Sequence, residues 1–250
     1  MKPERPTESE YLASYDADDF DRTSVAVDVA LLSIHEGELR VLLTRRDLQP
    51  QAGSWAVPGG FVRADEALDA AAERVIADKA RLKDIFVEQL YTFGAPGRDP
   101  RTRVVTVAYF ALVPLAALAH LDAPDAAGSR LVAALTVPWD GEAGGPVGIT
   151  MGSGAPGALA FDHADILGMA VKRLRGKLGY TDIGFALLPE RFTLRELRLV
   201  HETILARPIN KDSFRRRILA AGLVEDTGER QSEVGHRPAR LYRRKTPTAE

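Results

Sequence analysis

The sequence predicts an α+β protein built from two successive parts, and two patterns support this fold class. Between residues 24 and 113, runs rich in β-branched residues alternate with turn formers and one Ala-rich helical stretch. From residue 188 onward, two amphipathic helical stretches joined by a short turn are followed by a hairpin pattern. Strands grouped around a helix, followed by a small helical module, are typical of a two-domain α+β chain.

The charge distribution separates the same two parts. Residues 191–245 contain 14 Lys/Arg and 7 Asp/Glu, whereas the rest of the chain contains 19 Lys/Arg and 28 Asp/Glu. A basic C-terminal module on an acidic body indicates an anionic partner. A solvated basic surface is the alternative explanation, and charge alone favours nucleic acid only slightly.

Composition excludes several classes of function. The chain has 250 residues, of which 45% are hydrophobic, and it contains no cysteine, so disulfides, thiolate metal sites and thiol catalysis are excluded. The N-terminus lacks the apolar segment of a secretory signal. The apolar run 104–121 is interrupted by Pro114 and His120, which favours a strand over a membrane span. We therefore expect a cytoplasmic protein with no membrane partner.

The first part is expected to occupy residues 21–180, after a mobile acidic tail at 1–20. Asp65 is the expected N-cap of the Ala-rich helix, and His163, at the start of the last helix, is interpreted as structural. The Gly/Pro-rich stretch 141–158 is expected to be a flexible loop. The expected elements are strands at 24–34, 40–46, 87–93 and 103–113 and helices at 66–80 and 162–178.

The second part is expected at residues 188–245. Thr193 and Glu196 have the spacing of a capping box at the start of a helix, and Gly222 is placed to end the second helix, 211–220. Strand, turn-rich tip and returning strand follow. Helix, turn, helix and hairpin in this order are the outline of a winged helix-turn-helix domain.

Residues 60–82 carry a recognisable motif. Gly60, Glu66, Arg74, Ile76 and Leu82 have the spacing of the Nudix box, and the preceding WAVPGGF also resembles that family's entry into the box. The resemblance implies a Nudix α/β/α sandwich with a mixed sheet. A loop and helix that match by chance are improbable with this many matched positions, although a domain that only mediates assembly stays open.

The motif departs from the family at its metal-binding positions. Val75, Asp78 and Lys79 stand where the family has glutamates, and Arg81 replaces its late glycine. A valine cannot coordinate Mg²⁺, and a lysine brings positive charge to the place of the cation. We therefore expect no catalytic residue and no metal site, so the domain is not an enzyme, although weak hydrolysis through Asp78 and Glu66 is left open.

A pocket without metal can still bind a nucleotide. Lys79 is suited to neutralise phosphate charge, guanidinium groups suit phosphate oxygens, the Gly59-Gly60 turn permits close backbone approach, and an aromatic ring can stack a base. For each arginine a solvated surface position is the simpler alternative, and for each aromatic residue a core position. The expected effector-binding residues are Arg45, Arg46, Trp55, Gly59, Gly60, Glu66, Arg74, Lys79, Tyr91, Arg98 and Arg103, with Arg101 nearby.

The C-terminal part resembles the winged helix of the Nudix-related transcriptional regulators, the NrtR family, through FTLRELRLVHETIL, KDSFRRRIL and GHRPARLYR. A recognition helix reads bases in the major groove, and basic wing residues contact phosphates. A winged helix used only for protein contacts is the alternative. The expected DNA-binding residues are Lys211, Ser213, Arg215, Arg216, Arg217, Arg237, Pro238, Arg240 and Tyr242.

The family resemblance implies a repressor of NAD biosynthesis genes whose effector is ADP-ribose or a related nucleotide, with no cofactor required. A homodimer bound to a palindromic double-stranded operator is expected, because helix-turn-helix dimers match the symmetry of their sites. An active hydrolase of ADP-ribose-like pyrophosphates with an accessory winged helix is the main alternative. A dimeric interaction protein that binds neither ligand is the third.

Overall fold

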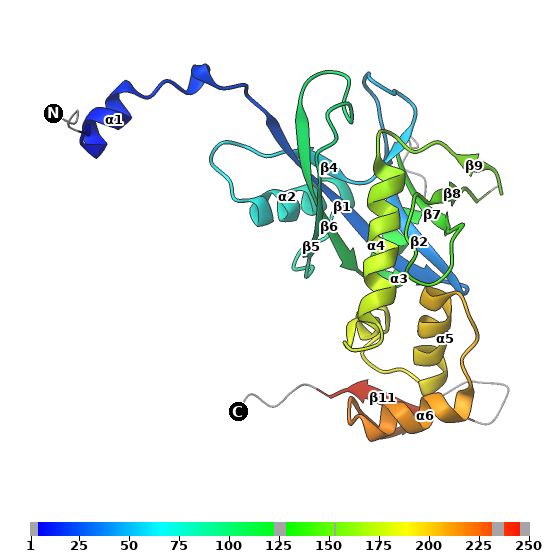
Figure 1. Ribbon diagram of the computed structural model, residues 1–250. Coiled ribbons are helices and arrows are strands. Elements are labelled where there is room, and N and C mark those ends of the chain that lie inside the picture. Colours follow the sequence, from blue (N-terminus) through cyan, green and yellow to red (C-terminus); the bar gives the residue numbers. More distant parts are fainter. Residues whose placement is uncertain (1–4, 123–128, 153, 232–237, 246–250) are drawn as a thin grey trace.

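A mixed β-sheet forms the centre of the N-terminal part in the computed structural model, which describes residues 5–122, 129–152, 154–231 and 238–245 (Figure 1). The strand order is β5-β6-β1-β2-β7-β8-β9, with β3 paired to β2 and β4 paired to β1. β1 runs parallel to β6 and antiparallel to β2, so the sheet is mixed as expected. The strands are β1 (Ser24–His35), β2 (Glu38–Arg45), β3 (Trp55–Ala56), β4 (Gly59–Phe61), β5 (Glu88–Phe93), β6 (Val104–Leu112), β7 (Arg130–Thr136), β8 (Gly148–Thr150) and β9 (Pro156–Gly157).

Helices cover both faces of this sheet. α2 (Leu68–Ala80) and α3 (Leu115–Asp122) pack on one face, in a core that includes Ala71, Val75 and Leu118. α4 (His163–Lys177) packs on the other face through residues such as Ile166 and Ala170. The α/β/α sandwich implied by the family resemblance is therefore confirmed, and the continuous burial of residues 26–33 of β1 is explained by cores on both sides.

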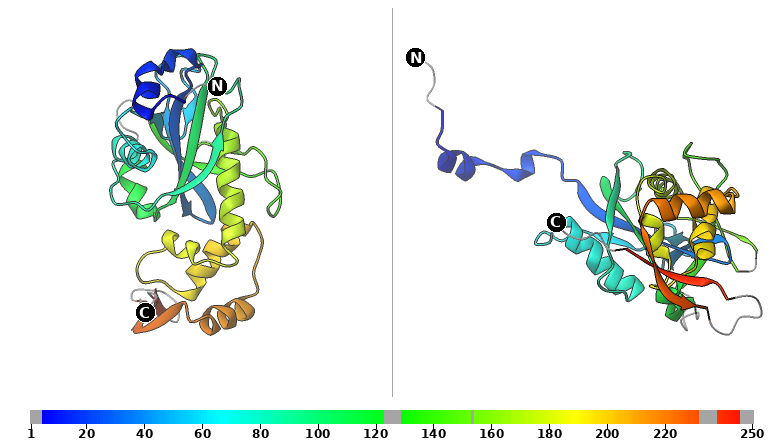
Figure 2. Two further views of the ribbon diagram at one scale, coloured as in Figure 1. Left: turned by 60° about the vertical axis from the view of Figure 1, so that its left-hand side comes forward. Right: turned by 90° about the horizontal axis from the view of Figure 1, so that it is seen from below.

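The C-terminal part forms a winged helix below α4 (Figures 1 and 2). It contains η2 (Ile183–Leu187), α5 (Leu194–Leu205), α6 (Lys211–Ala220) and the hairpin β10 (Val224–Arg230) and β11 (Arg240–Arg244). The Thr193 hydroxyl accepts a hydrogen bond from the Glu196 amide at 3.1 Å, and the Glu196 carboxylate accepts one from the Thr193 amide at 2.6 Å, which confirms the capping box. Gly222 follows α6 with φ of 64°, as expected for a glycine that ends a helix.

The two parts share one hydrophobic core. The cluster that contains Ile166 and Leu174 of α4 also contains Leu197 and Ile204 of α5 and Phe214 of α6. The winged helix is therefore packed against the sandwich along the lower half of α4, rather than joined to it by a free linker.

Two segments of the expected flexible loop 141–158 are instead strands of the sheet. β8 and β9 lie within it, Val147 and Ile149 are buried, and β8 pairs with the unpredicted strand β7. Its glycines allow close packing: a Cβ on Gly157 would lie 2.6 Å from a methyl group of Ile149. The interpretation as a flexible loop is therefore wrong for residues 148–150 and 156–157, which are strands, and at Gly157 the absence of a side chain allows them to pack closely.

One further expectation needs correction. α2 begins at Leu68 after Ala67, without a side-chain cap, so Asp65 is not its N-cap. Within the segment expected to be a mobile acidic tail, residues 8–14 form helix α1 (Glu8–Ser14) with a capping box at Thr7, followed by η1 (Ala17–Asp19), and the mobility of the segment stays a prediction. This arm stands clear of the sandwich (Figure 1).

Candidate effector pocket and nucleic-acid interface

A pocket of about 480 Å³ opens at the end of the sheet beside β4. Six of the eleven expected effector residues line it: Arg45, Arg46, Gly59, Gly60, Lys79 and Arg98. The other five, Trp55, Glu66, Arg74, Tyr91 and Arg103, lie outside the lining. The lining also includes Asp28, Asp99, Phe61 and Phe161, which the sequence did not single out as binding residues. Arg101, expected nearby, and His163, interpreted as structural, line the pocket as well.

Glu66 and Arg74 hold the loop that shapes the pocket. The Arg74 guanidinium forms an ion pair with Glu66 and donates to the carbonyl oxygen of Phe61 at 3.0 Å. The Arg63 amide donates to the same carboxylate at 2.8 Å. The hydrogen bonds from Arg74 lower the pKa of Glu66 to about 2. These residues therefore fix the connection between β4 and α2, and their place in the structure is architectural.

Val75 and Lys79 lie one helical turn apart on α2 but differ in burial. Val75 is buried in the core between α2 and the sheet, with a methyl group 3.4 Å from where a Cβ on Gly60 would stand. Lys79 is exposed and lines the pocket. Apolar packing holds Val75 inward, because α2 buries a stripe of alanine and aliphatic residues against the sheet.

A buried network lies at the back of the pocket. Arg98, with a side chain only 5% exposed, donates to both carboxylate oxygens of Asp162 at 2.8 and 2.6 Å and lies 3.5 Å from Asp28. His163 accepts a hydrogen bond at Nδ1 from the Val57 amide at 3.0 Å, and its Nε2 is 3.8 Å from Asp28. Burial lowers the pKa of His163, so the neutral ring is favoured.

Gly59 is required by the approach of Asp28. A Cβ at position 59 would lie 2.1 Å from Oδ1 of Asp28 and 3.0 Å from the carbonyl oxygen of Val27. The group that approaches Gly59 is thus a carboxylate of the protein itself, and close approach of an effector to this turn stays a prediction.

The open side of the pocket combines cations with aromatic faces. The Arg46 guanidinium lies 4.6 Å from the centre of the Phe161 ring, and that of Arg101 lies 5.6 Å from Phe61. Arg101 is paired with Asp99, whereas Arg46 and Lys79 have no carboxylate within ion-pair distance among the residues described. Such a site suits a ligand with phosphates and a planar ring.

The two aromatic residues expected to stack a base have other surroundings. Trp55 packs in β3 against the core shared with α4, and Tyr91 lies on edge strand β5 with its ring 5.3 Å from that of Phe93. Phe61 and Phe161 are the rings at the pocket instead. Neither ring was predicted to bind the effector: Phe61 was noted only as the end of the WAVPGGF motif, and the residues around Phe161 gave no local signal. Over the chain as described, no group of three or more His, Asp and Glu residues is arranged to hold a metal ion.

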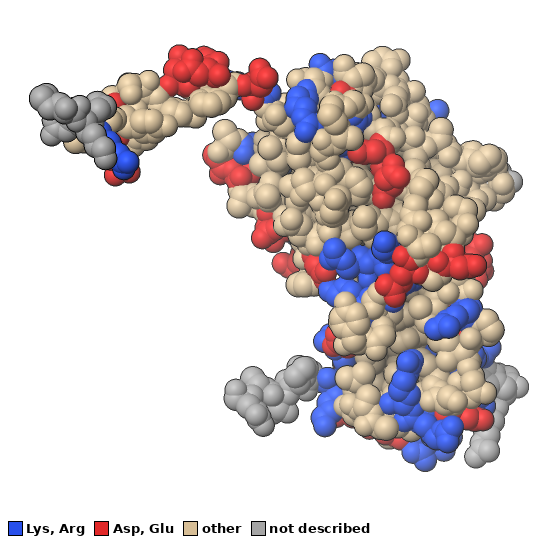
Figure 3. Space-filling view, in the orientation of Figure 1, with Lys and Arg blue, Asp and Glu red and all other residues tan. Residues whose placement is uncertain are grey.

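The winged helix presents a basic groove. α6 buries Phe214 and Ile218 and exposes Lys211, Ser213, Arg215 and Arg216. A hollow of about 1020 Å³ lies between α5, α6 and the hairpin. Its basic lining residues are Arg195, Arg198, Lys211, Arg215, Arg230 and Arg240. Figure 3 shows Lys and Arg gathered on this part of the molecule. The arrangement fits a polyanion, with α6 as the helix that enters a groove.

Three of the expected DNA-binding residues, Tyr242, Arg217 and Arg240, have other contacts in the structure. Tyr242 is buried, and its backbone pairs with Phe192, so its side chain supports the wing from inside. Arg217 lies 5.5 Å from the Phe214 ring and lines a separate hollow behind α6. Arg240 is exposed but forms an ion pair with Asp226 at 2.7 Å. Arg237 lies outside the described residues, while Pro238 is exposed beside the groove.

Sequence reasoning missed Arg195, Arg198 and Arg230 on the groove. Arg195 and Arg198 lie on α5, from which no DNA-binding residue was predicted, and Arg230 ends β10. Their signal was the surplus of basic residues in the whole module. None of the helices in the described ranges is long and apolar enough to cross a membrane.

α4 connects the pocket to the winged helix. Its N-cap Asp162 and its first residue His163 belong to the buried network of the pocket. Near its other end, Arg175 is 4% exposed and donates to the carbonyl oxygens of Ile204, Trp139 and Gly141 at 2.8, 3.1 and 2.9 Å. Ile204 belongs to the last turn of α5, so this guanidinium joins the two domains.

Comparison with known proteins decides the family. The chain is 36% identical over 244 residues to the ADPR responsive transcriptional repressor NtrR of Acinetobacter baylyi, covering 95% of this chain and 88% of that protein. The NrtR DNA-binding winged helix domain model matches residues 184–244, and the NUDIX domain model matches residues 23–140.

The chain belongs to the NrtR family.

Solved structures of similar proteins have the same architecture. Shewanella oneidensis NrtR, in a complex with a 27mer DNA, matches with a TM-score of 0.72 and 35% identity, over 88% of this chain and 93% of that one. A MutT/nudix family protein from Enterococcus faecalis matches with a TM-score of 0.75 and 27% identity, over 97% and 95%. The family resemblance stated from the sequence is thereby confirmed across both domains of this NrtR family member.

Proposed function

We propose that this NrtR family member is a DNA-binding transcriptional repressor whose Nudix domain binds ADP-ribose or a related nucleotide. The observation that carries the proposal is the similarity to an ADPR responsive repressor over 95% of the chain, which includes both the pocket and the basic groove. The proposed target genes are those of NAD biosynthesis. The proposed form is a homodimer on a palindromic operator in the cytoplasm.

The pocket supports an anionic nucleotide as effector. Arg45, Arg46 and Lys79 bring positive charge to its open side, and Phe161 offers a ring face under Arg46. Guanidinium groups suit phosphate oxygens, and an aromatic face suits a purine. We assign Lys79 to the phosphates and the Arg46–Phe161 pair to the neighbourhood of the base.

Hydrolysis is not part of the proposed function. A Nudix hydrolase needs divalent metal bound to carboxylates on the helix that is α2 here. Val75 is buried in the core, and Lys79 brings a cation to the pocket side of that helix. We therefore assign this domain a sensing role with no required cofactor, and the absence of turnover is open to direct measurement.

The communication between the two sites is proposed to run through α4. Phosphate oxygens that bind Arg98 compete with Asp162 for the same guanidinium, and Asp162 is the N-cap of α4. A shift at this end moves a helix whose other end is bound to α5 through Arg175. The effector then favours one arrangement of the winged helices over another, as thermodynamic linkage requires.

The decisive experiment is a gel shift on the DNA upstream of the protein's own gene, titrated with ADP-ribose. We expect a specific complex whose affinity falls steeply with salt and that dissociates as ADP-ribose is added. Arg216→Ala with Arg240→Ala should abolish the shift but preserve ADP-ribose binding. Lys79→Glu should preserve the shift in the absence of effector and weaken its response to ADP-ribose.

A phosphate-release assay on ADP-ribose with Mg²⁺ or Mn²⁺ completes the test. Efficient turnover that Glu66→Gln abolishes would favour the hydrolase alternative. A missing or salt-insensitive shift, together with no nucleotide binding, would favour a protein that only mediates assembly.

A further inference from the structure

The N-terminal arm, residues 7–22, makes no buried contact with its own chain. Every one of its residues is exposed. Yet it is locally ordered: Thr7 and Glu10 form a reciprocal capping box, and the rings of Tyr11, Tyr15 and Phe20 lie in a row with successive centres 5.9 Å apart. Both Figure 1 and the right view of Figure 2 show α1 standing away from the sandwich.

The apolar side chains of the arm need a surface to cover them. Tyr11, Leu12, Tyr15 and Phe20 are 53%, 63%, 49% and 62% exposed. A helix of seven residues is not stable in water by itself, because nucleation costs more than so few hydrogen bonds return. An apolar row on such a segment is stabilised when it packs against a second apolar surface.

The sandwich offers a matching surface on the connection between α2 and β5. Phe86 is 82% exposed there, which is the largest exposure of any large apolar side chain in the ranges described. Beside it lies a hollow of about 380 Å³ lined in part by Leu82, Lys83 and Ile85. We call Arg81 to Phe86 the Phe86 patch.

Charge also favours this pairing. The arm contains six carboxylates, Glu8, Glu10, Asp16, Asp18, Asp19 and Asp21, against one basic residue, Arg22. In the Phe86 patch, Arg81 and Lys83 are exposed and have no carboxylate within ion-pair distance among the described residues. Asp84 lies in the patch and Glu73 borders the same hollow, so the attraction to the acidic arm is assigned to Arg81 and Lys83 alone.

We propose that the N-terminal arm of one copy of this chain packs on the Phe86 patch of a second copy. A two-fold axis makes the exchange reciprocal, so each copy gives one arm and receives one. The dimer formed in this way does not require DNA or nucleotide. The proposal rests on the homodimer of the proposed function, to which it adds a contact surface, and it is independent of the effector and of the operator.

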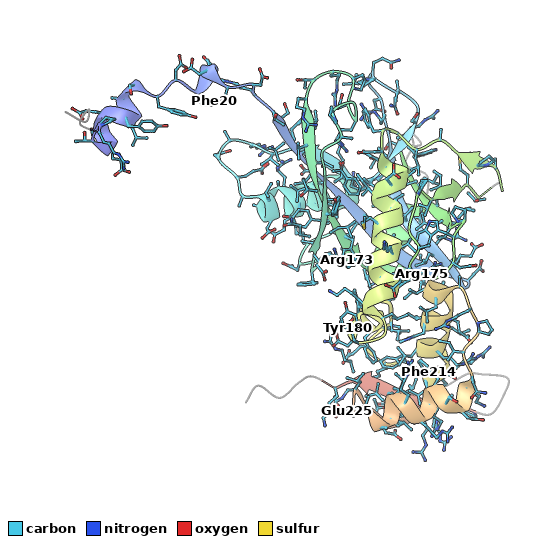
Figure 4. All side chains as sticks on the ribbon, viewed as in Figure 1. Phe20, Arg173, Arg175, Tyr180, Phe214 and Glu225 are labelled. Atoms are coloured by element: carbon cyan, nitrogen blue, oxygen red, sulfur yellow. The ribbon has the colours of Figure 1, made fainter. Side chains whose placement is uncertain are left out.

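The absence of cysteine from the chain permits a direct test. Phe20→Cys and Phe86→Cys are purified separately as full-length proteins of different tag length, mixed, and treated with a short bismaleimide. We expect a crosslinked species that contains one chain of each kind. The matched control pairs Phe20→Cys with Tyr180→Cys, because Tyr180 is 77% exposed and lies near the winged helix, far from Phe20 in Figure 4.

A crosslink yield equal to that of the control pair would overturn the proposal. In the double variant Phe20→Cys/Phe86→Cys, crosslinking within one chain in place of crosslinking between chains would show that the arm folds back on its own patch. That result would also overturn the proposal.

Sedimentation equilibrium of unlabelled protein gives an independent measurement. The double variant Leu12→Asp/Phe20→Asp should raise the dissociation constant of the dimer at least ten-fold, whereas Tyr180→Asp should leave it unchanged. Both positions in the arm are exposed, so the thermal transition of the monomer should not move. A monomeric wild-type chain, or an unchanged dissociation constant in the arm variant, would contradict the exchange.

Discussion

Replacing Arg175 by methionine should loosen the junction between the two domains. The guanidinium donates three hydrogen bonds to backbone carbonyls, one of them on the last turn of α5, and it stacks 4.8 Å from the Trp139 ring. Methionine keeps much of the apolar stem but donates nothing, so the three carbonyls lose their charged donor.

The magnitude follows from those three bonds. At roughly 1.5 kcal/mol for each hydrogen bond from a charged donor, their loss destabilises the junction by about 4.5 kcal/mol. Part of this loss in stability is offset, because methionine removes a charge that is costly to bury. Burial disfavours the charged guanidinium and lowers the pKa of Arg175. We expect a net loss of about 3 kcal/mol in the free energy of unfolding.

Trp139 is a built-in probe for this measurement. In a Trp55→Phe background, urea unfolding followed by the fluorescence of Trp139 reports on the junction alone, since the chain has only two tryptophans. Arg173→Met is the matched control, two residues earlier on α4 (Figure 4). Arg173 contacts Glu88 and the carbonyl of Leu90, both on β5, so it lies within the sandwich.

The same pair of variants tests the communication between the sites. Arg175→Met should retain ADP-ribose affinity but lose most of the effector's influence on DNA affinity, whereas Arg173→Met should retain both. If the two variants unfold at the same urea concentration and respond equally to ADP-ribose, the reasoning about Arg175 is refuted.

Three further predictions follow from individual residues. Gly59→Ala should reduce ADP-ribose binding more than ten-fold by calorimetry and lower the Tm, because its methyl group would collide with Asp28. Burial and the nearby Arg217 lower the pKa of His201 from 6.5 to about 4. The unfolded chain therefore binds more protons in this range, and stability should fall from pH 6.5 to pH 4 in urea titrations, less so in His201→Gln. Arg216→Ala should weaken operator binding at least ten-fold and lower its salt dependence by fluorescence anisotropy, and Arg217→Ala should weaken it less.

Local patterns in the sequence predicted the parts of the fold that depend on neighbouring residues. The hairpin of β1 and β2 follows from two β-branched runs around a short turn, and the start of α5 follows from the Thr193 and Glu196 capping box. Strand β7 was not predicted because its sequence, RLVAALT, has no alternation that separates it from a helix.

The pocket could be predicted only in part, for the same reason. Gly60 and Lys79 are found from one continuous motif. The pairing of Arg98 with Asp162 joins residues 64 positions apart, and that of Val57 with His163 joins residues 106 apart. Such contacts are decided by how the sheet and α4 pack, and a single sequence contains no local signal for them.

Because the interior of the sandwich continues into the winged helix, the sensor cannot be exchanged for another by cutting where the winged-helix homology begins, at residue 184. Such a cut would separate Leu174 and Leu178 from Leu197 and Ile204. The DNA-binding domain would then expose an apolar patch to solvent. A recombination event compatible with folding would have to carry the whole of α4 along with the DNA-binding half. Helix α4 therefore belongs structurally to both domains. The boundary between the domains is a packed surface along this helix and cannot be assigned to a single residue of the chain.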